Sequence, residues 1–189
     1  MSVRLLTSNE IFMLNKKLSI AKAAEQLFAQ RGYEHTSTLL IAKEAGVSDA
    51  LIFKHFGSKD KLLEHLIKSG YRRIVSSNRG ILQGETPLDL IHNVLDLPAK
   101  LVAEEPLFWE LQYRLIDLPL SLSEHSRFLQ PVHKLLVSSF KSLGYANPEE
   151  ETLLLLLLVD ALWKKEVING SDSTRPLREL MKKKYASQV

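Results

Sequence analysis

A short segment with helix-stop signals on both sides places the strongest constraint on the fold. Residues 49–56, DALIFKHF, follow the turn residues Gly46 and Ser48 and precede Gly57 and Ser58. The segment is long enough for about two helical turns, and an isolated helix of that length is unstable in water. It can therefore be helical only if its apolar side chains pack against neighbouring helices.

A first helix is predicted upstream of this segment. Its apolar residues recur every three or four positions, as on one face of a helix, and Gly32 then provides a stop after Arg31. The residues of this predicted face are Leu14, Leu18, Ala21, Ala24 and Phe28. Because the pattern becomes firm only near Leu14, Met13 is an alternative start of the protein.

A second helix is predicted from the cap residues 36–38 to about Ala45. Gly46 permits a left-handed turn, so the second helix, the turn AGVS and the short helix form a helix-turn-helix pattern. We expect Val47, Ile52 and Phe56 to point inward. The outward face of such a helix can enter the DNA major groove, which is about 12 Å wide. That outward face carries Asp49, Ala50, Leu51, Phe53, Lys54 and His55.

The rest of the chain is predicted to form six longer helices after three short ones. Prolines at first-turn positions begin several of them, whereas Pro98 should kink or end the fifth helix, and Pro131 indicates a break or a later start of the seventh helix. The fourth helix, at about residues 59–78, has Leu62, Leu63, Leu66, Ile67, Tyr71 and Ile74 on one side. Strand signals are almost absent. The fold is therefore predicted to be all-α with about nine helices, as a three-helix head at residues 1–58 and a helical body at residues 59–189.

Charge and composition narrow the possible partners. The net charge is +3, and residues 1–70 hold ten Lys or Arg against seven Asp or Glu, whereas the remainder is balanced. A basic bias in one small segment fits a polyanion partner, although a solvated face explains it nearly as well. The absence of cysteine excludes disulfides and suits a cytoplasmic protein. The longest apolar run has seven residues, so we expect no membrane segment.

The stretch RGYEHTSTLLIAKEAGVSDALIFKHFGSKDKLL resembles the DNA-binding signature of the tetracycline-repressor (TetR) family of bacterial transcription regulators. The resemblance is dense from about Leu18 to Leu66 and includes the patterns LF..RGY, IA..AGVS and HF.SK..LL. It implies a one-component regulator, more often a repressor, that binds a pseudo-palindromic double-stranded operator as a homodimer. The body would then dimerise and bind a small, mainly apolar effector.

The resemblance also implies which residues contact DNA. Phosphate contacts correspond to Ser37, Thr38 and Lys59, backbone contacts to Phe53, Lys54 and His55, and base-facing positions to Asp49, Ala50 and Leu51, with Ser48 beside them. Three positions depart from the family pattern: Phe53 replaces a usual tyrosine, Ala50 another small residue, and Leu39 an arginine that some members use. Asp49 either stabilises the helix N-terminus or accepts a hydrogen bond from cytosine N4.

The body offers weaker signals. Phe108, Trp109 and Tyr113 cluster after Pro106 and are candidate effector-binding residues, although such aromatic residues are more often part of a core. The leucines at 153–158 predict a helix that faces the core on one side and a second copy on the other. We therefore expect a dimer through the last two helices, with Leu157 and Trp163 on its interface.

An enzyme and a helical adaptor are the two other classes of protein that the sequence bears on. The six histidines form neither an HExxH motif nor a paired metal-ligand spacing, and there is no phosphate-binding glycine loop or nucleophile elbow. The chain is therefore not expected to be an enzyme or to hold a metal or another cofactor. A helical adaptor with a basic head and no effector is the alternative, and salt-sensitive retention on DNA distinguishes it from a regulator.

Overall fold

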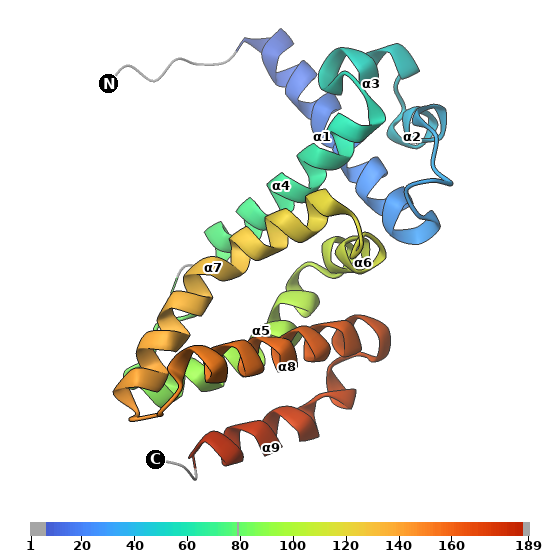
Figure 1. The fold of residues 1–189 in the computed structure, drawn as a ribbon. Coiled ribbons are helices and arrows are strands. Elements are labelled where there is room, and N and C mark those ends of the chain that lie inside the picture. The colour runs from blue at the N-terminus through green and yellow to red at the C-terminus, as the bar shows by residue number, and fades with distance from the viewer. Residues whose placement is uncertain (1–6, 79, 187–189) are drawn as a thin grey trace. The chain divides into compact units, whose positions relative to one another are not determined.

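The computed structural model describes residues 7–78 and 80–186. Over these residues the chain forms nine α-helices, one short 3-10 helix and no strand, which confirms the all-α prediction. Figure 1 shows the helices in chain order. They are α1 (Ser8–Arg31), α2 (Thr38–Ala45), α3 (Asp49–Phe56), α4 (Lys59–Ser77), α5 (Pro87–Glu104), α6 (Pro106–Arg114), α7 (Pro119–Ser142), α8 (Pro148–Asn169) and α9 (Arg175–Ala186), with the 3-10 helix η1 at Ser171–Ser173.

The chain divides into two compact units, one ending at Gly70 and one beginning at Tyr71. The division falls inside α4, so the first part of this helix belongs to the unit that holds α1–α3. We call the first unit the head and the second the body. The functional boundary that the sequence suggests, between residues 58 and 59, lies at the start of α4 and stays a prediction.

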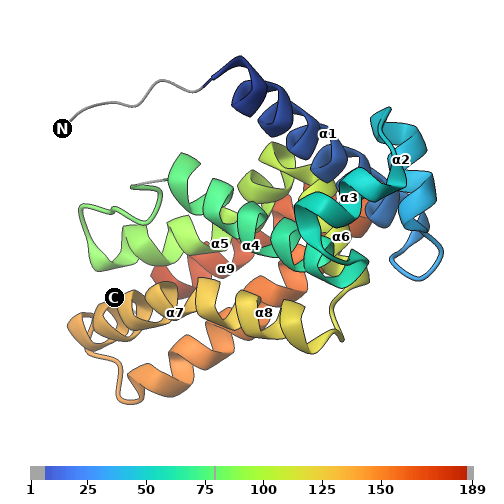
Figure 2. The same ribbon diagram turned by 90° about the horizontal axis from the view of Figure 1, so that it is seen from above.

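The head is built around the C-terminal half of α1. α2 and α3 pack against α1 and against each other, as Figure 2 shows. Its fully buried side chains come from all four helices and include Ile20, Phe28, Ile41, Ile52 and Leu62. Burying each side chain of this size contributes about 1.5–3 kcal/mol, so a helix as short as α3 is stable only through these contacts.

The packing face of α1 differs from the predicted one. The helix already begins at Ser8, because Thr7 and Glu10 form a capping box. Its buried positions start at Ile20, whereas Leu14 and Leu18 are 47% and 60% exposed. The prediction was wrong there because a three- and four-residue spacing of apolar residues continues beyond the part of α1 that other helices cover. α1 is also a long helix of 24 residues and not a short one.

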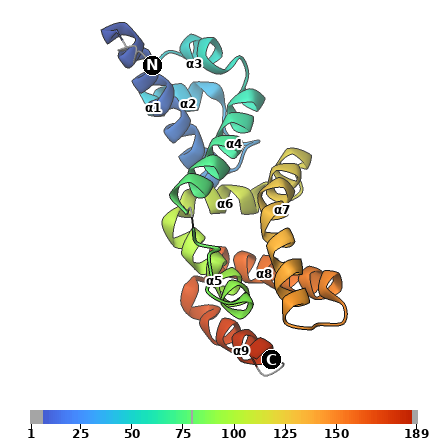
Figure 3. The same ribbon diagram turned by 90° about the vertical axis from the view of Figure 1, so that its left-hand side faces the viewer.

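The body packs α8 against both α5 and α7, and α9 against α5. Figure 3 shows α5, α7 and α8 as neighbours. The core side chains with no exposed area include Ile91, Leu95, Phe108, Leu136 and Phe140. No helix in the described part of the chain is both long and apolar enough to span a membrane.

Two internal prolines do not end their helices. α5 continues through Pro98 to Glu104, and α7 runs as one helix from Pro119 through Pro131. The predicted break at Pro131 was therefore wrong. A proline removes one backbone hydrogen bond, and the buried residues on both sides of it, such as Leu97 and Leu101 in α5, keep the helix in place.

The two long apolar helices behave differently. All six residues predicted on one side of α4 are buried. α8 is mixed: Leu155 is fully buried, whereas Leu157 is 69% exposed and Leu153 and Leu154 are more than half exposed. Trp163 is buried at 7% exposure, so it belongs to the core of the body and its predicted place on a dimer surface was wrong.

Candidate nucleic-acid interface and ligand cavities

Gly46 forms the turn of the helix-turn-helix. It lies in the left-handed region at φ 63° and ψ 42°, and its N–H donates to the carbonyl oxygens of Ala42 and Lys43. The Val47 N–H then donates to the Ala42 carbonyl at 3.0 Å. A side chain at Gly46 would meet no neighbouring atom within 4 Å, so the requirement for glycine is conformational, worth about 1–2 kcal/mol.

Serine side chains cap the helices around this turn. The Ser37 hydroxyl accepts from the Leu40 N–H at 3.2 Å, and the Ser58 hydroxyl accepts from the Lys61 N–H at 3.1 Å. Ser48 occupies the N-cap of α3 in an extended conformation, but its side chain makes no cap hydrogen bond. Ser19 donates to the Ala45 carbonyl at 3.1 Å and so joins α1 to the end of α2. The exposed Ser48 hydroxyl is thus available for a further partner.

The outer face of α3 presents most of the residues predicted to contact DNA. Ala50, Phe53 and Lys54 are exposed, whereas the inward positions Ile52 and Phe56 are buried. The remaining predicted positions on α3, Asp49, Leu51 and His55, are half-buried. The face is therefore apolar and basic, with Phe53 46% exposed at its centre. DNA contact by these side chains stays a prediction.

A groove runs between α2 and α3 beside this face. Its lining comprises Ser37, Leu39, Leu40, Ala42, Lys43, Val47, Ser48 and Asp49. Leu39 is 70% exposed, which is unusual for a leucine in a small unit with a packed core. Thr38, the first residue of α2, is half-buried. The groove thus joins Ser37, which is predicted to meet phosphate, with Ser48 and with Asp49, which is predicted to face the bases.

Lys59 lies over the ring of Tyr33, with Nζ 4.0 Å from the ring centre. The Tyr33 hydroxyl in turn donates to Asp60, and burial together with this carboxylate raises the pKa of Tyr33. A cation at the N-terminus of α4 faces the positive end of the helix dipole, so the tyrosine ring offsets part of that repulsion. Tyr33 therefore positions Lys59, a contact for which the only sequence signal is the RGY pattern that contains Tyr33.

His55 has a packing role as well as a predicted contact. Its ring lies 6.3 Å from that of Phe56, and its Nε2 is buried with no hydrogen-bond partner among the described residues. Burial lowers the pKa of His55, and the nearby charges of Lys17 and Lys54 lower it further. The imidazole is therefore mainly neutral near neutral pH, so a phosphate contact from His55 would be a neutral hydrogen bond.

Two adjoining cavities in the body have empty volumes of about 400 and 410 Å³, open solvent included. They share His125, Asp160 and Trp163 as a common wall. The first is otherwise lined by Leu97, Pro98, Leu101, Trp109, Phe128, Leu129 and Val159. The second is otherwise lined by Tyr71, Gln112, Ile116, Ser121, Leu122 and Lys164. One cavity is thus mainly apolar, and the other carries most of the polar groups.

Of the three predicted effector residues, Trp109 lines the first cavity. Phe108 is fully buried and packs edge-on against Tyr71 at 5.1 Å, and Tyr113 is half-buried with its ring 6.4 Å from that of Trp163. Neither Phe108 nor Tyr113 lines these two cavities. Their rings contact Tyr71 and Trp163, which line the second cavity, and their roles toward an effector stay predictions.

Sequence reasoning missed the polar residues of the second cavity. The Ser121 hydroxyl donates to Gln112 Oε1 at 2.8 Å, and the Tyr71 hydroxyl lies 3.3 Å from the same oxygen and 3.1 Å from His125 Nδ1. The amide oxygen of Gln112 therefore faces both hydroxyls and accepts from each of them. The Nε2 of Gln112 is then buried with no hydrogen-bond partner in the described part of the chain. Only the packing of α4, α6 and α7 brings these residues together, although Gln112 lies one turn after Trp109.

Burial sets the charge state of the shared wall. It lowers the pKa of His125, with Asp160 acting in the opposite direction and Lys164 adding to the effect. Burial also raises the pKa of Tyr71. The Lys164 ammonium lies 2.7 Å from the Asp160 carboxylate. The wall is therefore close to electrically neutral at neutral pH.

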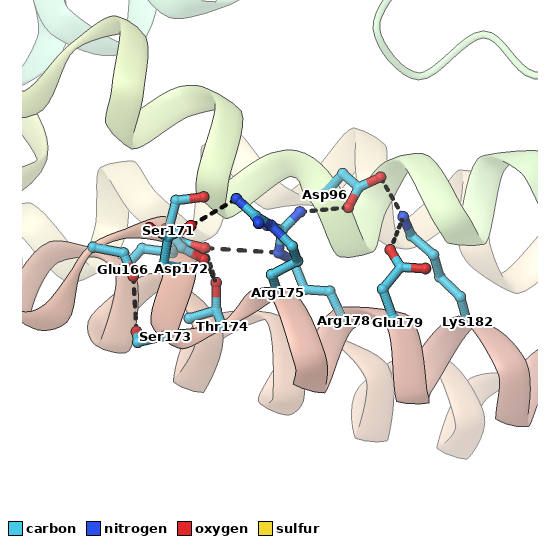
Figure 4. Close-up of polar contacts among 11 residues, drawn as sticks. Asp96, Glu166, Ser171, Asp172, Ser173, Thr174, Arg175, Arg178, Glu179 and Lys182 are labelled. Carbon is cyan, nitrogen blue, oxygen red and sulfur yellow. Dashed lines mark hydrogen bonds and ion pairs between the residues drawn. The ribbon is translucent and has the colours of Figure 1, made fainter.

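A polar cluster holds α9 to the rest of the body, as Figure 4 shows. The Arg178 guanidinium lies 2.7 Å from Asp96 of α5 and 3.7 Å from Glu166 of α8, and Lys182 lies 2.7 Å from Asp96. The Thr174 hydroxyl donates to Glu166. Arg178 and Glu166 are both buried; Asp96 compensates the charge of Arg178 at the shorter distance, and Arg178 is the cation beside Glu166. We call these five residues the α9 clasp.

Comparisons with known proteins bear first on the head. The family model described as "Bacterial regulatory proteins, tetR family" matches residues 20–66. The HTH-type transcriptional regulator YvkB of Bacillus subtilis is 33% identical over 135 residues, which are 66% of this chain and 66% of that protein. An HTH-type transcriptional repressor of Mycobacterium tuberculosis is 34% identical over 85 residues, 45% of this chain and 43% of the relative. The matches span about two thirds of the first relative's length and less than half of the second's.

A solved structure extends the likeness of fold to the body. A TetR-like transcriptional regulator from Rhodococcus sp. RHA1 aligns with a TM-score of 0.71 at 20% sequence identity. The alignment covers 97% of this chain and 99% of that chain. At this level of identity the likeness concerns the fold alone. The family match includes the turn, α3 and Lys59, but it ends before the residues that line the cavities.

Proposed function

Because the chain belongs to the TetR family of bacterial regulatory proteins, we propose that it regulates transcription by binding a pseudo-palindromic operator as a homodimer. A small, mainly apolar effector in the body would lower its affinity for the operator. Its relatives are transcriptional regulators and not enzymes. Repression is the mode we propose, since a dimer bound at a promoter blocks access of the polymerase.

The observation that carries the DNA-binding proposal is the outward face of α3. It exposes Phe53 and Lys54 beside the groove that contains Ser37 and Ser48, and Lys59 is held at the N-terminus of α4. Serine hydroxyls and lysines at such positions serve as phosphate contacts that fix the register of a recognition helix on the duplex. The excess of basic residues in the first 70 positions supports the same partner.

An exposed apolar surface supports the dimer. Leu153, Leu154 and Leu157 of α8 are exposed, as are Leu177 and Leu180 of α9. Exposed apolar surface of this kind on helices that already have a packed inner face usually marks an interface. A two-fold dimer through α8 and α9 would place two recognition helices about 34–36 Å apart on the operator, or a multiple of that spacing.

Selection of bound duplexes from a random DNA pool by the full-length chain tests the proposed function. We expect enrichment of inverted repeats whose half-sites are separated by about one helical turn or a multiple of it. A pool that remains random after repeated rounds would favour the adaptor alternative, in which the basic head binds an acidic protein. That alternative assigns no role to the two cavities of the body.

The effector proposal has its own test in a thermal-shift screen of small apolar molecules, followed by titration of each hit with and without operator. A ligand that weakens operator binding must itself bind more weakly to the operator complex by the same factor. We expect a coupling of about 1–3 kcal/mol, the usual range. If operator leaves the affinity of every hit unchanged, the effector role is contradicted and the body serves only for dimerisation.

A further inference from the structure

The two adjoining cavities differ in the polarity of their lining residues. The shared wall of His125, Asp160 and Trp163 separates an apolar end, formed by residues such as Leu101 and Phe128, from a polar end. A ligand that fills both therefore has an apolar body and a polar group at one end.

The polar end offers hydrogen-bond donors that have no acceptor. Gln112 is 2% exposed and Trp163 is 7% exposed, and both line the second cavity. Gln112 Nε2 and Trp163 Nε1 have no hydrogen-bond partner within residues 7–78 and 80–186. The oxygen of the Gln112 amide is already used by Ser121 and Tyr71, so only its N–H groups remain. An indole N–H also donates only. The ligand group that complements this end is an acceptor.

The charges around the cavities are compensated within the chain. Asp160 and Lys164 lie one turn apart on α8 and form an ion pair at 2.7 Å. On α7, Glu124 is paired with Arg127 at 2.8 Å. His125 is buried, which lowers its pKa and keeps the imidazole mainly neutral. A buried carboxylate or ammonium needs an opposite charge or several hydrogen bonds, and this site offers no uncompensated charge.

Resting on the proposed function of the body as an effector site, we propose that the effector is a neutral carbonyl compound with an alkyl or aryl body. Its carbonyl oxygen accepts from Gln112 Nε2 and Trp163 Nε1 in the second cavity. Its apolar body lies against Leu101, Phe128 and Val159 in the first. Free fatty acids and quaternary ammonium compounds are excluded by the same reasoning, because each would bring an unpaired charge.

The chain provides its own reporter for this proposal. It has two tryptophans, Trp109 and Trp163, and both line the first cavity. Intrinsic fluorescence of the full chain without DNA therefore follows occupation of the site. The probes form a matched set with one phenyl body: 4-phenyl-2-butanone, butylbenzene, 3-phenylpropanoate and 3-phenylpropyl-trimethylammonium.

We expect the ketone to bind roughly tenfold more tightly than butylbenzene, since it satisfies buried donors that the hydrocarbon leaves unpaired. The two charged probes should bind more weakly than the ketone. In Gln112→Met, which keeps the length of the side chain and removes the donor, the advantage of the ketone over butylbenzene should fall to about twofold or less. Gln130→Met on the exposed side of α7 is the control and should keep the full difference.

Because Gln112→Met also removes the acceptor for Ser121, folding of each variant is checked by its melting curve. Trp163→Phe provides a second variant that removes one donor and keeps an aromatic ring, with Trp109 still reporting. Equal affinity for ketone and hydrocarbon, tightest binding by a charged probe, or no binding by any probe would overturn the ligand class. Ketone binding that leaves operator affinity unchanged would uphold the ligand class and contradict only the proposed effector role.

Discussion

The head and the body present their candidate sites in opposite ways. The predicted DNA contacts of the head come from one continuous stretch, Ser37 to Lys59, and half of them are exposed, on short helices or at their caps. The cavities of the body draw on residues from Tyr71 to Lys164 in five helices, and much of their lining is buried. A surface that binds a rigid duplex can be formed by neighbouring residues of one short stretch, whereas a cavity needs several helices to form its walls.

The two units also differ in what holds α3 and α9 in place. α3 is held by apolar residues such as Ile52 and Phe56, whereas α9 is held by the buried charges of the α9 clasp. Apolar packing tolerates a conservative change, but a buried charge that loses its partner is strongly destabilising. A single substitution in the α9 clasp should therefore destabilise the body more than a conservative substitution in the apolar contacts of α3 destabilises the head.

The largest predicted effect follows from this difference. Arg178→Met should lower the free energy of unfolding of the body by about 3–5 kcal/mol, because Glu166 is left buried without its cation. Arg175→Met is the matched control: its ion pair with Asp172 has side chains 66% and 90% exposed, so we expect a change below about 1 kcal/mol. Denaturant unfolding followed by tryptophan fluorescence reports the body selectively, since both tryptophans lie there. Equal effects of the two substitutions would show that the clasp adds no special stability.

The second prediction concerns the outer face of the body. Leu157→Glu should convert the proposed dimer to a monomer or to aggregates at micromolar concentration, because a charge would be buried in an apolar interface. Leu135→Glu on α7, where the leucine is 42% exposed, should leave the dimer intact. Light scattering with size-exclusion chromatography gives the mass of each species. A clean monomer for the unsubstituted chain would contradict the dimer itself.

The third prediction tests the head through its electrostatics. Lys59→Ala should weaken binding about equally for all DNA sequences and reduce the slope of log affinity against log salt by about 0.9, as for the loss of one phosphate contact. Lys61→Ala changes an exposed lysine two residues further along α4 and is the control. Fluorescence anisotropy at several salt concentrations measures both slopes. An unchanged slope and affinity for Lys59→Ala would remove this residue from the interface.

The smallest predicted effect is a dependence of body stability on pH. Burial lowers the pKa of His125 below its ordinary value of 6.5, so the unfolded chain binds more protons than the folded chain at mildly acidic pH. The stabilisation is therefore present above the unfolded pKa of 6.5 and decreases as pH falls through that value toward the lower folded-state pKa.

His125→Gln should flatten this decrease, whereas His35→Gln, an exposed histidine of the head, should leave it unchanged. Melting curves by tryptophan fluorescence at several pH values test the comparison. The groups that face His125 are Tyr71, Asp160 and Lys164, and they are left in place in both variants. A steeper loss of stability in His125→Gln than in the unsubstituted chain would contradict the assignment.

The sequence was most informative where local rules decide the structure. Glycine at 46, serine caps at 37 and 58 and the apolar side of α4 predicted the turn, the helices and six buried residues. The sequence was least informative where packing against distant helices determines which residues are buried and where a helix continues. Leu18 follows the helical period but no other helix covers it, and Pro98 stays helical because its neighbours are packed.

The same division applies to the candidate sites. The residues of α3 could be assigned to faces from spacing alone, because one short helix has one inward side. Gln112, Asp160 and Trp163 could not be assigned to a cavity, since no sequence spacing relates α6 to α8. Tyr33 lies between these cases: its pattern was visible, but its stacking with Lys59 depends on the loop between α1 and α2.

Binding of the full chain to its selected operator tests the central claim most directly. Fluorescence anisotropy would compare three duplexes at about 50 and 200 mM salt: the selected duplex, a copy in which one half-site is scrambled, and a duplex of random sequence. We predict that the intact duplex binds at least roughly a thousandfold more tightly than random DNA, that scrambling removes most of this advantage, and that affinity falls steeply with salt. Equal, weak binding to all three duplexes, with no dependence on the second half-site, would contradict a dimeric DNA-binding regulator.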